Sequence, residues 1–197
     1  VAARIIESEH ADALARLVRV LAADGSVPPE GCFGPALPGQ TSVRAPAYLA
    51  ASPDGKVTYI SGLMRGEETL DTVFRASWSD KEAAEFIPKT AGLKDPRGLA
   101  VDAQGRIYVC DFDNSLVRVY GPEGKELAGL PVAGPEQVAV HPKTGAAYVL
   151  SVRDEVKGKR PKSTEYFNKA LVKFRGIDKW EALAQLPLPQ RRRSGAE

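Results

Sequence analysis

The sequence predicts an all-β fold: an arc of a β-propeller with about three and a half four-stranded blades. Two observations lead to this prediction. One stretch of sequence recurs three times, at 45–62, 95–112 and 134–152. Each copy holds two short apolar runs separated by a turn, and two further apolar runs follow each copy. A repeat of about 40–50 residues is typical of propellers and solenoids, so the repeat decides the fold class.

Three residue types mark equivalent positions in the copies. They are the opening prolines Pro46, Pro96 and Pro135, the turn glycines Gly55, Gly105 and Gly145, and the tyrosines Tyr59, Tyr108 and Tyr148. In the middle copy we expect strands at 98–101 and 106–110, with Gly105 free to take positive φ between them. Both runs are almost continuously apolar, which favours a sheet covered on both faces.

The rest of each unit supplies a third and a fourth strand. These are expected at 116–120 and 127–131 in the middle unit, at 171–174 and 183–187 in the last, and at 73–76 and 84–87 in the first. Four strands per unit is the composition of a propeller blade.

These units divide the chain into consecutive blades. We expect a partial blade at 1–27, a loop at 28–44, a blade at 45–90, a second at 91–132, a third at 133–189 that carries a long basic loop at 153–169, and a tail at 190–197. The partial blade has an alternative, because Asp12–Ala23 has the composition of an amphipathic helix. A strand at 17–21 is favoured, since it and the following Asp24 and Gly25 match the repeat at 116–125.

An open arc leaves strand edges and apolar blade faces uncovered, and closed propellers have about 4–8 blades. The chain begins at Val1 rather than at methionine and ends in the run 191–195, and both features favour a fragment of a longer propeller. The alternative, for a complete chain, is an oligomer in which two arcs close on each other. Frequent alanine and arginine are typical of a bacterial source.

The middle blade carries the motifs of a known repeat. It has a Pro-x-Gly opening at Pro96, a strand ending in Asp102, an Ile-Tyr-Val strand at 107–109, an Asp-x-Asp-Asn turn at 111–114 and a Val-Arg-Val-Tyr strand at 117–120. Residues 95–130 therefore resemble the NHL repeat, the unit of mostly six-bladed propellers. The resemblance implies that this arc is part of a six-bladed propeller. Propellers of this shape serve as binding scaffolds, sensor domains, RNA-binding modules and enzymes.

Composition limits the class of protein. The chain has 197 residues, 43% of them hydrophobic, and a net charge of +2, which predicts a globular protein. No apolar run reaches the roughly 18–20 residues of a membrane span. The only cysteines, Cys32 and Cys110, do not form a disulfide scaffold, and Cys110 is expected to pack in the core. The compartment stays open, with a periplasmic or secreted location favoured over a cytoplasmic one.

Binding residues are expected on the propeller face that gathers the loops between second and third strands and between blades. The candidates are Arg65, Glu67, Arg97, Asp111, Asp113, Asn114, Arg153, Lys157, Lys159, Arg160 and Tyr166. Each has a structural alternative: solvated charges at 61–71, Asx turn closure at 111–114, a solvated insertion at 153–169, and a loop salt bridge at Arg97.

No catalytic motif accompanies these candidates. The sequence has no Gly-x-Ser-x-Gly elbow, no phosphate-binding glycine loop and no His-Glu-x-x-His pair. His10 and His141 are not part of a zinc-spaced cluster, and the turn at 111–114 offers too few oxygens for calcium. We therefore expect no catalytic residue, no metal and no cofactor.

Three functions remain open. The first, which we favour, is a non-enzymatic module that binds a protein, a peptide or a small ligand. The second follows from a resemblance to gluconolactonase-type hydrolases, in which an asparagine after the blade-opening proline binds a metal. The matching residues here are Ala47, Arg97 and Glu136, so most of the metal site would have to lie in blades outside this sequence. The third is RNA binding by the basic loop with Tyr166 and Phe167, although the near-neutral net charge argues against nucleic acid.

Overall fold

The structure is a computed structural model of the chain. It describes residues 2–6, 17–21, 33–36, 41–42, 47–65, 68–77, 79–152 and 169–188, with side chains from residue 47 onward. Within these ranges the regular secondary structure is β-strand apart from one short 3₁₀ helix, η1 (Lys89–Ala91). None of the described helical structure is long and apolar enough to cross a membrane.

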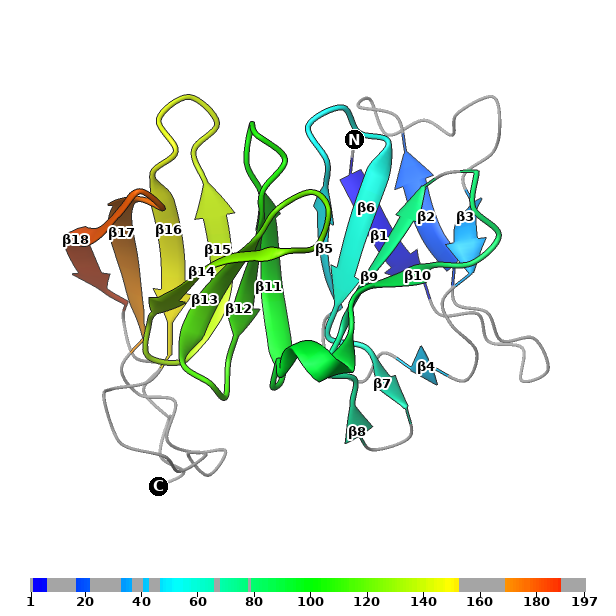
Figure 1. Ribbon diagram of the computed structural model, residues 1–197, viewed down its shortest axis with the longest axis horizontal. Coiled ribbons are helices and arrows are strands. Elements are labelled where there is room, and N and C mark those ends of the chain that lie inside the picture. Colours follow the sequence, from blue (N-terminus) through cyan, green and yellow to red (C-terminus); the bar gives the residue numbers. More distant parts are fainter. Residues whose placement is uncertain are drawn as a thin grey trace, which may run out of the picture.

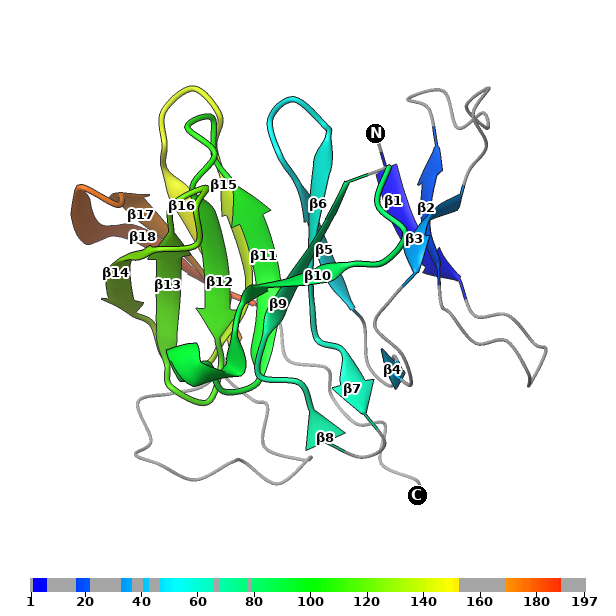
Figure 2. The ribbon, with the colours of Figure 1, turned by 45° about the vertical axis from the view of Figure 1, so that its right-hand side comes forward.

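Three consecutive four-stranded antiparallel sheets form the centre of the fold (Figures 1 and 2). The first contains β5 (Tyr48–Ala51), β6 (Val57–Ser61), β9 (Val73–Ser77) and β10 (Ala84–Ile87). The second contains β11 (Pro96–Val101), β12 (Ile107–Asp111), β13 (Leu116–Tyr120) and β14 (Glu126–Pro131). The third contains β15 (Pro135–Val140), β16 (Ala147–Ser151), β17 (Ala170–Gly176) and β18 (Lys179–Pro187). In each sheet the strands pair in chain order, so the first and last strands are edges.

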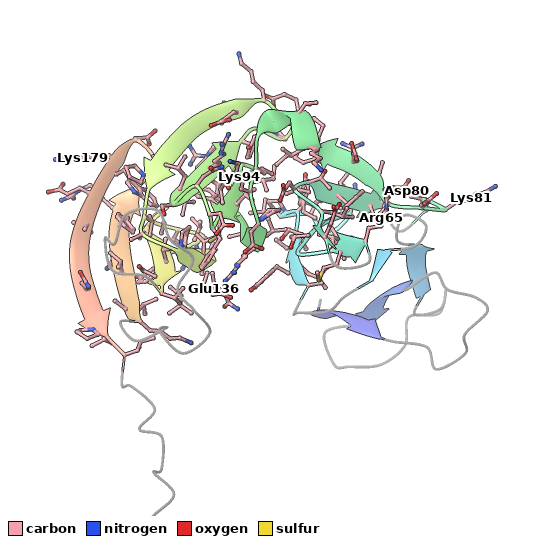
Figure 3. The ribbon with its side chains drawn as sticks, turned by 90° about the horizontal axis from the view of Figure 1, so that it is seen from below. Arg65, Asp80, Lys81, Lys94, Glu136 and Lys179 are labelled. Atoms are coloured by element: carbon pink, nitrogen blue, oxygen red, sulfur yellow. The ribbon has the colours of Figure 1, made fainter. Side chains whose placement is uncertain are left out.

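The three sheets stand side by side as blades around an arc, which Figure 3 shows end on. The first strand of each blade lies on the concave side, and β11 contacts both β5 and β15. The fourth strands lie on the outside of the arc. This radial arrangement confirms the predicted all-β propeller arc.

Two smaller sheets precede and accompany the first blade. β1 (Ala2–Ile6), β2 (Leu17–Leu21) and β3 (Phe33–Ala36) form one, and β4 (Thr41–Ser42) pairs with the hairpin of β7 (Met64–Arg65) and β8 (Glu68–Thr69) in the other. Residues 17–21 therefore form a strand rather than a helix. The expected loop at 28–44 contains β3 and β4, because each of these short segments finds a pairing partner elsewhere in the chain.

Apolar side chains fill the spaces between blades. Tyr59 and Ile87 pack with Leu99 between the first and second blades, while Tyr108 packs with Phe174 between the second and third. Because both faces of the second blade are covered, all positions of β12 are buried. This double burial explains why the strands appear in the sequence as continuous apolar runs.

Cys110 belongs to the core between the second and third blades. Its side chain is completely buried and is a free thiol, and burial raises its pKa. Packing is therefore its role, as the sequence predicts. Cys32 lies outside the described residues.

Candidate functional site

The first strands of the three blades all begin at one face of the arc, which also carries η1 and the β7–β8 hairpin (Figure 1). We call this the loop face. Arg97 and Glu136 each follow the proline that opens a blade, and Tyr48 lies one position further along β5. The arc brings these residues together with Asp95, and Figure 3 shows Glu136 on its concave side. We refer to Tyr48, Asp95, Arg97 and Glu136 as the central cluster.

Hydrogen bonds of Arg97 and Tyr48 connect the central cluster. The Arg97 Nε and Nη2 atoms donate to Asp95 Oδ2 over 3.1 and 2.7 Å. Arg97 Nη1 donates to Glu136 Oε2, and the Tyr48 hydroxyl donates to Glu136 Oε1 over 2.7 Å. The cluster thus joins three neighbouring blades, since Tyr48 lies on β5, Arg97 on β11 and Glu136 on β15.

The scaffold holds Arg97 in place from several directions. Its guanidinium carbon lies 3.3 Å from the centre of the Phe112 ring, a cation–π contact. Its carbonyl accepts a 2.6 Å hydrogen bond from Ser61 Oγ of the first blade. Asp95 has a φ of 53°, and its N–H donates to Asp71 Oδ1 over 3.0 Å. Each of these contacts restricts the guanidinium, so the cluster is preorganised.

The surroundings of Arg97 and Tyr48, the two hydrogen-bond donors of the cluster, keep both side chains protonated. Burial alone would lower the pKa of Arg97, but its hydrogen bonds and charge interactions with Asp95 and Glu136 raise it overall. Burial and the hydrogen bond to Glu136 raise the pKa of Tyr48 well above its ordinary value. The cluster therefore contains two carboxylates, one guanidinium and a neutral phenol, with one negative charge in excess.

A cavity of about 330 Å³ lies beside the cluster on the inner strands. It is lined by Ala47, Tyr48, Leu49, Gly98, Leu99, Gln137 and Val138. β11 and β15 come unusually close here: a Cβ atom on Gly98 would lie 2.5 Å from Gln137 Cα and 2.8 Å from the Glu136 carbonyl oxygen. Only glycine fits between these backbones, so Gly98 sets the shape of the cavity wall.

The turn at 111–114 is engaged within the scaffold. The Asp111 carboxylate is fully buried and accepts hydrogen bonds from the Lys94 N–H at 2.8 Å, Arg118 Nε at 2.6 Å and Asn114 Nδ2 at 2.7 Å. Asn114 Nδ2 also donates to the Gly92 carbonyl over 2.9 Å. Asp113 is half-buried in the same turn, and its N–H donates to the Lys94 carbonyl. These bonds correspond to the structural alternative, closure of the loop by Asx side chains.

Of the remaining predicted binding residues, the structure describes only Arg65, which has no contact with the central cluster among the hydrogen bonds and ion pairs of the described residues. Arg65 is exposed on β7. The others lie outside the described residues; they are Glu67, Arg153, Lys157, Lys159, Arg160 and Tyr166.

Sequence reasoning missed Tyr48 and Asp95 as members of a site, and considered Glu136 only as a metal ligand. Tyr48 aligns with Gly98 and Gln137 in the other copies, so the repeat itself marks it as an unusual residue at the start of an inner strand. Its contact with Glu136, 88 residues away, has no sequence signal.

A metal does not fit the positions that a gluconolactonase-like site would use. Of Ala47, Arg97 and Glu136, only Glu136 has a carboxylate, and the guanidinium of Arg97 already pairs with it. Across the described ranges, no group of three or more His, Cys, Asp or Glu side chains is arranged to hold a metal ion.

Comparison with known proteins agrees with the fold. Residues 93–120 match the family model described as the NHL repeat and overlap the segment 95–130 whose motifs predicted it. No curated protein sequence matches the chain. Among solved structures, the chain is similar to one in the nidogen/laminin complex, with a TM-score of 0.59, 17% identity, and coverage of 90% of this chain and 59% of that one. The chain is a partial β-propeller.

Two enzymes are also among the similar structures. A luciferin-regenerating enzyme aligns with a TM-score of 0.58 and 15% identity over 85% of this chain and 54% of its own. Hydrazine synthase of Kuenenia stuttgartiensis aligns with a TM-score of 0.54 and 19% identity over 76% of this chain and 37% of its own. This chain therefore spans between 37% and 59% of the three similar chains. At such identities the likeness is one of fold alone.

Proposed function

We propose that this chain is a non-enzymatic propeller module that binds its ligand on the loop face, at the central cluster and the cavity beside it. One observation carries the proposal: a preorganised group of polar side chains from three blades borders a cavity of about 330 Å³. Ligand sites are typically concave, with a few fixed polar groups, and have volumes of roughly 300–1,000 Å³.

The chemistry of the cluster supports binding rather than catalysis. Arg97 forms ion pairs with both carboxylates of the cluster. The Tyr48 hydroxyl has a raised pKa and donates a hydrogen bond to Glu136, so it keeps its proton at neutral pH and cannot act as a base. Arg97 keeps a second N–H on both Nη1 and Nη2 without an acceptor among the described residues. These donors are available to a ligand.

Two substitutions test the site. A panel of small polar compounds and short peptides is added to the ¹⁵N-labelled chain, and amide shifts are recorded by NMR. We expect the shifts to gather at Tyr48, Arg97 and Gln137, and the Arg97→Met variant to weaken binding about tenfold, the usual effect of losing a charged hydrogen bond. Arg175→Met, at an exposed ion pair on β17, is the matched control and should bind normally. Shifts confined to other faces, or equal effects of both variants, would contradict the proposal.

An enzyme assay provides the complementary test. With Ca²⁺ or Zn²⁺ present, we expect no hydrolysis of a sugar lactone or an aryl ester by the chain. Metal-dependent turnover that is lost in Glu136→Gln would replace the binding module with the hydrolase.

A further inference from the structure

The inner strands leave a row of backbone groups facing the concave side. β5, β11 and β15 are each an edge of their sheet, so each pairs with its blade on one side only. In an antiparallel pair, alternate residues exchange hydrogen bonds with the partner strand, and those between them direct N–H and C=O to the other edge. Which residues face the concave side is therefore fixed by the turn at the end of each strand.

Three turn hydrogen bonds define that alternation. The Ser52 N–H donates to the Val57 carbonyl, the Asp102 N–H to that of Arg106, and the His141 N–H to that of Ala146. Two residues earlier, the strand registers pair Ala50 with Tyr59, Ala100 with Tyr108, and Ala139 with Tyr148. Leu49, Leu99 and Val138 come one position before these alanines and are therefore of the other kind, so their backbone N–H and C=O groups point away from their blades.

These same three residues line the cavity. Leu99 and Val138 belong to the apolar clusters between the blades and Leu49 packs against the cluster of the first blade, while their outward backbone groups are directed to the concave side. Within the described ranges, no strand of a neighbouring blade pairs with β5, β11 or β15 on this side. The residues that line the cavity thus include one from each inner strand whose backbone N–H and C=O groups point away from its own blade.

An extended peptide has the complementary pattern. Its backbone offers alternating N–H and C=O groups along each edge, and pairing with a free strand edge is a common mode of peptide binding. The excess negative charge at the loop-face end of the cavity favours a positive group there and disfavours a carboxylate. An entering peptide would therefore place its amino terminus, rather than its carboxyl terminus, beside Asp95 and Glu136.

We propose that the ligand of this site is a short extended peptide segment, bound with its free amino terminus at the central cluster and its backbone paired to an inner-strand edge. This inference rests on the proposed function, since it uses the same cavity. It goes beyond that function by naming the class of ligand and its direction.

Tetraalanine amide is a suitable probe, because its side chains add little recognition of their own. NMR titration of the ¹⁵N-labelled chain should shift the amide signals of Leu49, Leu99 and Val138. Acetylation of the probe's amino terminus should weaken binding about tenfold, since it removes a charge-assisted hydrogen bond. A probe with every backbone nitrogen methylated should cause no shifts, because it cannot donate to the strand edges.

Two matched glutamine variants control for the position of the site. Gln137 lines the cavity, whereas Gln104 is exposed in the β11–β12 turn. We expect Gln137→Trp to abolish the shifts and Gln104→Trp to retain them. If Gln137→Trp does not fold, Glu136→Gln provides the test. It should weaken the binding of tetraalanine amide about tenfold and leave the binding of the acetylated probe unchanged.

Absence of shifts at saturating probe, or equal binding of the methylated probe, would overturn the inference. If other polar compounds then shift the signals of Tyr48 and Arg97, the proposed binding function survives and only the peptide is excluded. If nothing shifts those signals, both proposals fail.

Discussion

At the scale of single residues, equivalent-looking charges have different tasks. Asp111 and Arg97 both lie on the loop face and were both candidate binding residues. Asp111 is fully buried and bonded to the backbone of the preceding interblade loop, whereas Arg97 is 19% exposed beside a cavity. Burial and bonding partners, rather than residue type, separate the structural charge of Asp111 from Arg97, the charge that we propose binds a ligand.

Loss of the Asp111 carboxylate should destabilise the fold. Asp111→Ala leaves the half-buried Arg118 guanidinium without its 2.6 Å partner, and we expect the free energy of unfolding to fall by about 3 kcal/mol. Glu181→Ala, which removes exposed ion pairs to Arg175 and Lys179, should cost less than about 1 kcal/mol. Urea denaturation measures both, and equal losses would show that Asp111 is not part of the scaffold.

Stability should fall at alkaline pH because of buried tyrosines. Burial raises the pKa of Tyr120 to about 12, whereas a tyrosine in the unfolded chain has a pKa of about 10. Between these values the unfolded chain loses its proton first, so the free energy of unfolding decreases as the pH rises. The contribution of Tyr120 is complete below pH of about 10 and is lost as the pH rises through about 12.

The variant Tyr120→Phe isolates that contribution. The Tyr120 hydroxyl has no hydrogen-bond partner among the described residues, so the change removes no hydrogen bond. Between pH of about 10 and 12, the variant should lose about 2 kcal/mol less stability than the original chain. Tyr108, whose pKa burial also raises to about 12, continues to titrate in both proteins. Identical alkaline denaturation curves would contradict the prediction.

At the scale of elements, the inner strands determine the site because they approach each other without pairing. β5, β11 and β15 belong to different sheets, yet their starts form one cavity wall. The sequence predicted these strands within a few residues, since their apolar runs and turn glycines are local signals. It did not predict the short strands β3 and β4, whose pairing with β2 and β7 depends on distant segments.

Gly98, the single glycine of the inner strands β5, β11 and β15, should be sensitive to substitution. Gly98→Ala places a methyl group within 2.8 Å of two backbone atoms of β15, and overpacking of this kind costs about 2 kcal/mol. Gly129→Ala on β14 is the control, because its nearest neighbours are side-chain atoms at 3.7 and 3.8 Å. Thermal unfolding should show a lower Tm for the first variant and no loss for the second. An unchanged Tm for Gly98→Ala would mean that β11 and β15 can separate freely.

At the scale of the whole molecule, the two faces of the third blade differ. One face of the third blade packs against the second blade. The other face carries residues whose equivalents in the second blade are buried. By strand register, Leu171 and Leu186 correspond to Val117 and Leu130 of the second blade. Leu171 and Leu186 are 36% and 60% exposed, whereas Val117 and Leu130 are 0% and 7% exposed. The arc therefore exposes an apolar surface of the kind that blades use to pack.

This surface should bind a hydrophobic dye. The native chain is expected to enhance ANS fluorescence, and the double variant Leu171→Ser and Leu186→Ser should remove most of that signal. Leu127→Ser is the control, since Leu127 is 50% exposed on β14, away from this face. A signal that the double variant leaves intact would place the apolar surface elsewhere.

The sequence by itself determined the blades, their order and the loop face, because strand periodicity, turn glycines and a repeated motif are encoded locally. It also identified Arg97 as a candidate residue at that face. Only the tertiary structure decided that Arg97 and Tyr48 both contact Glu136. It also decided that Asp111 belongs to the scaffold. The physical reason is that these contacts cross between blades, where curvature of the arc, rather than spacing in the chain, sets which side chains meet. The cavity has the same origin, since three unpaired strand edges form it and no single repeat contains it.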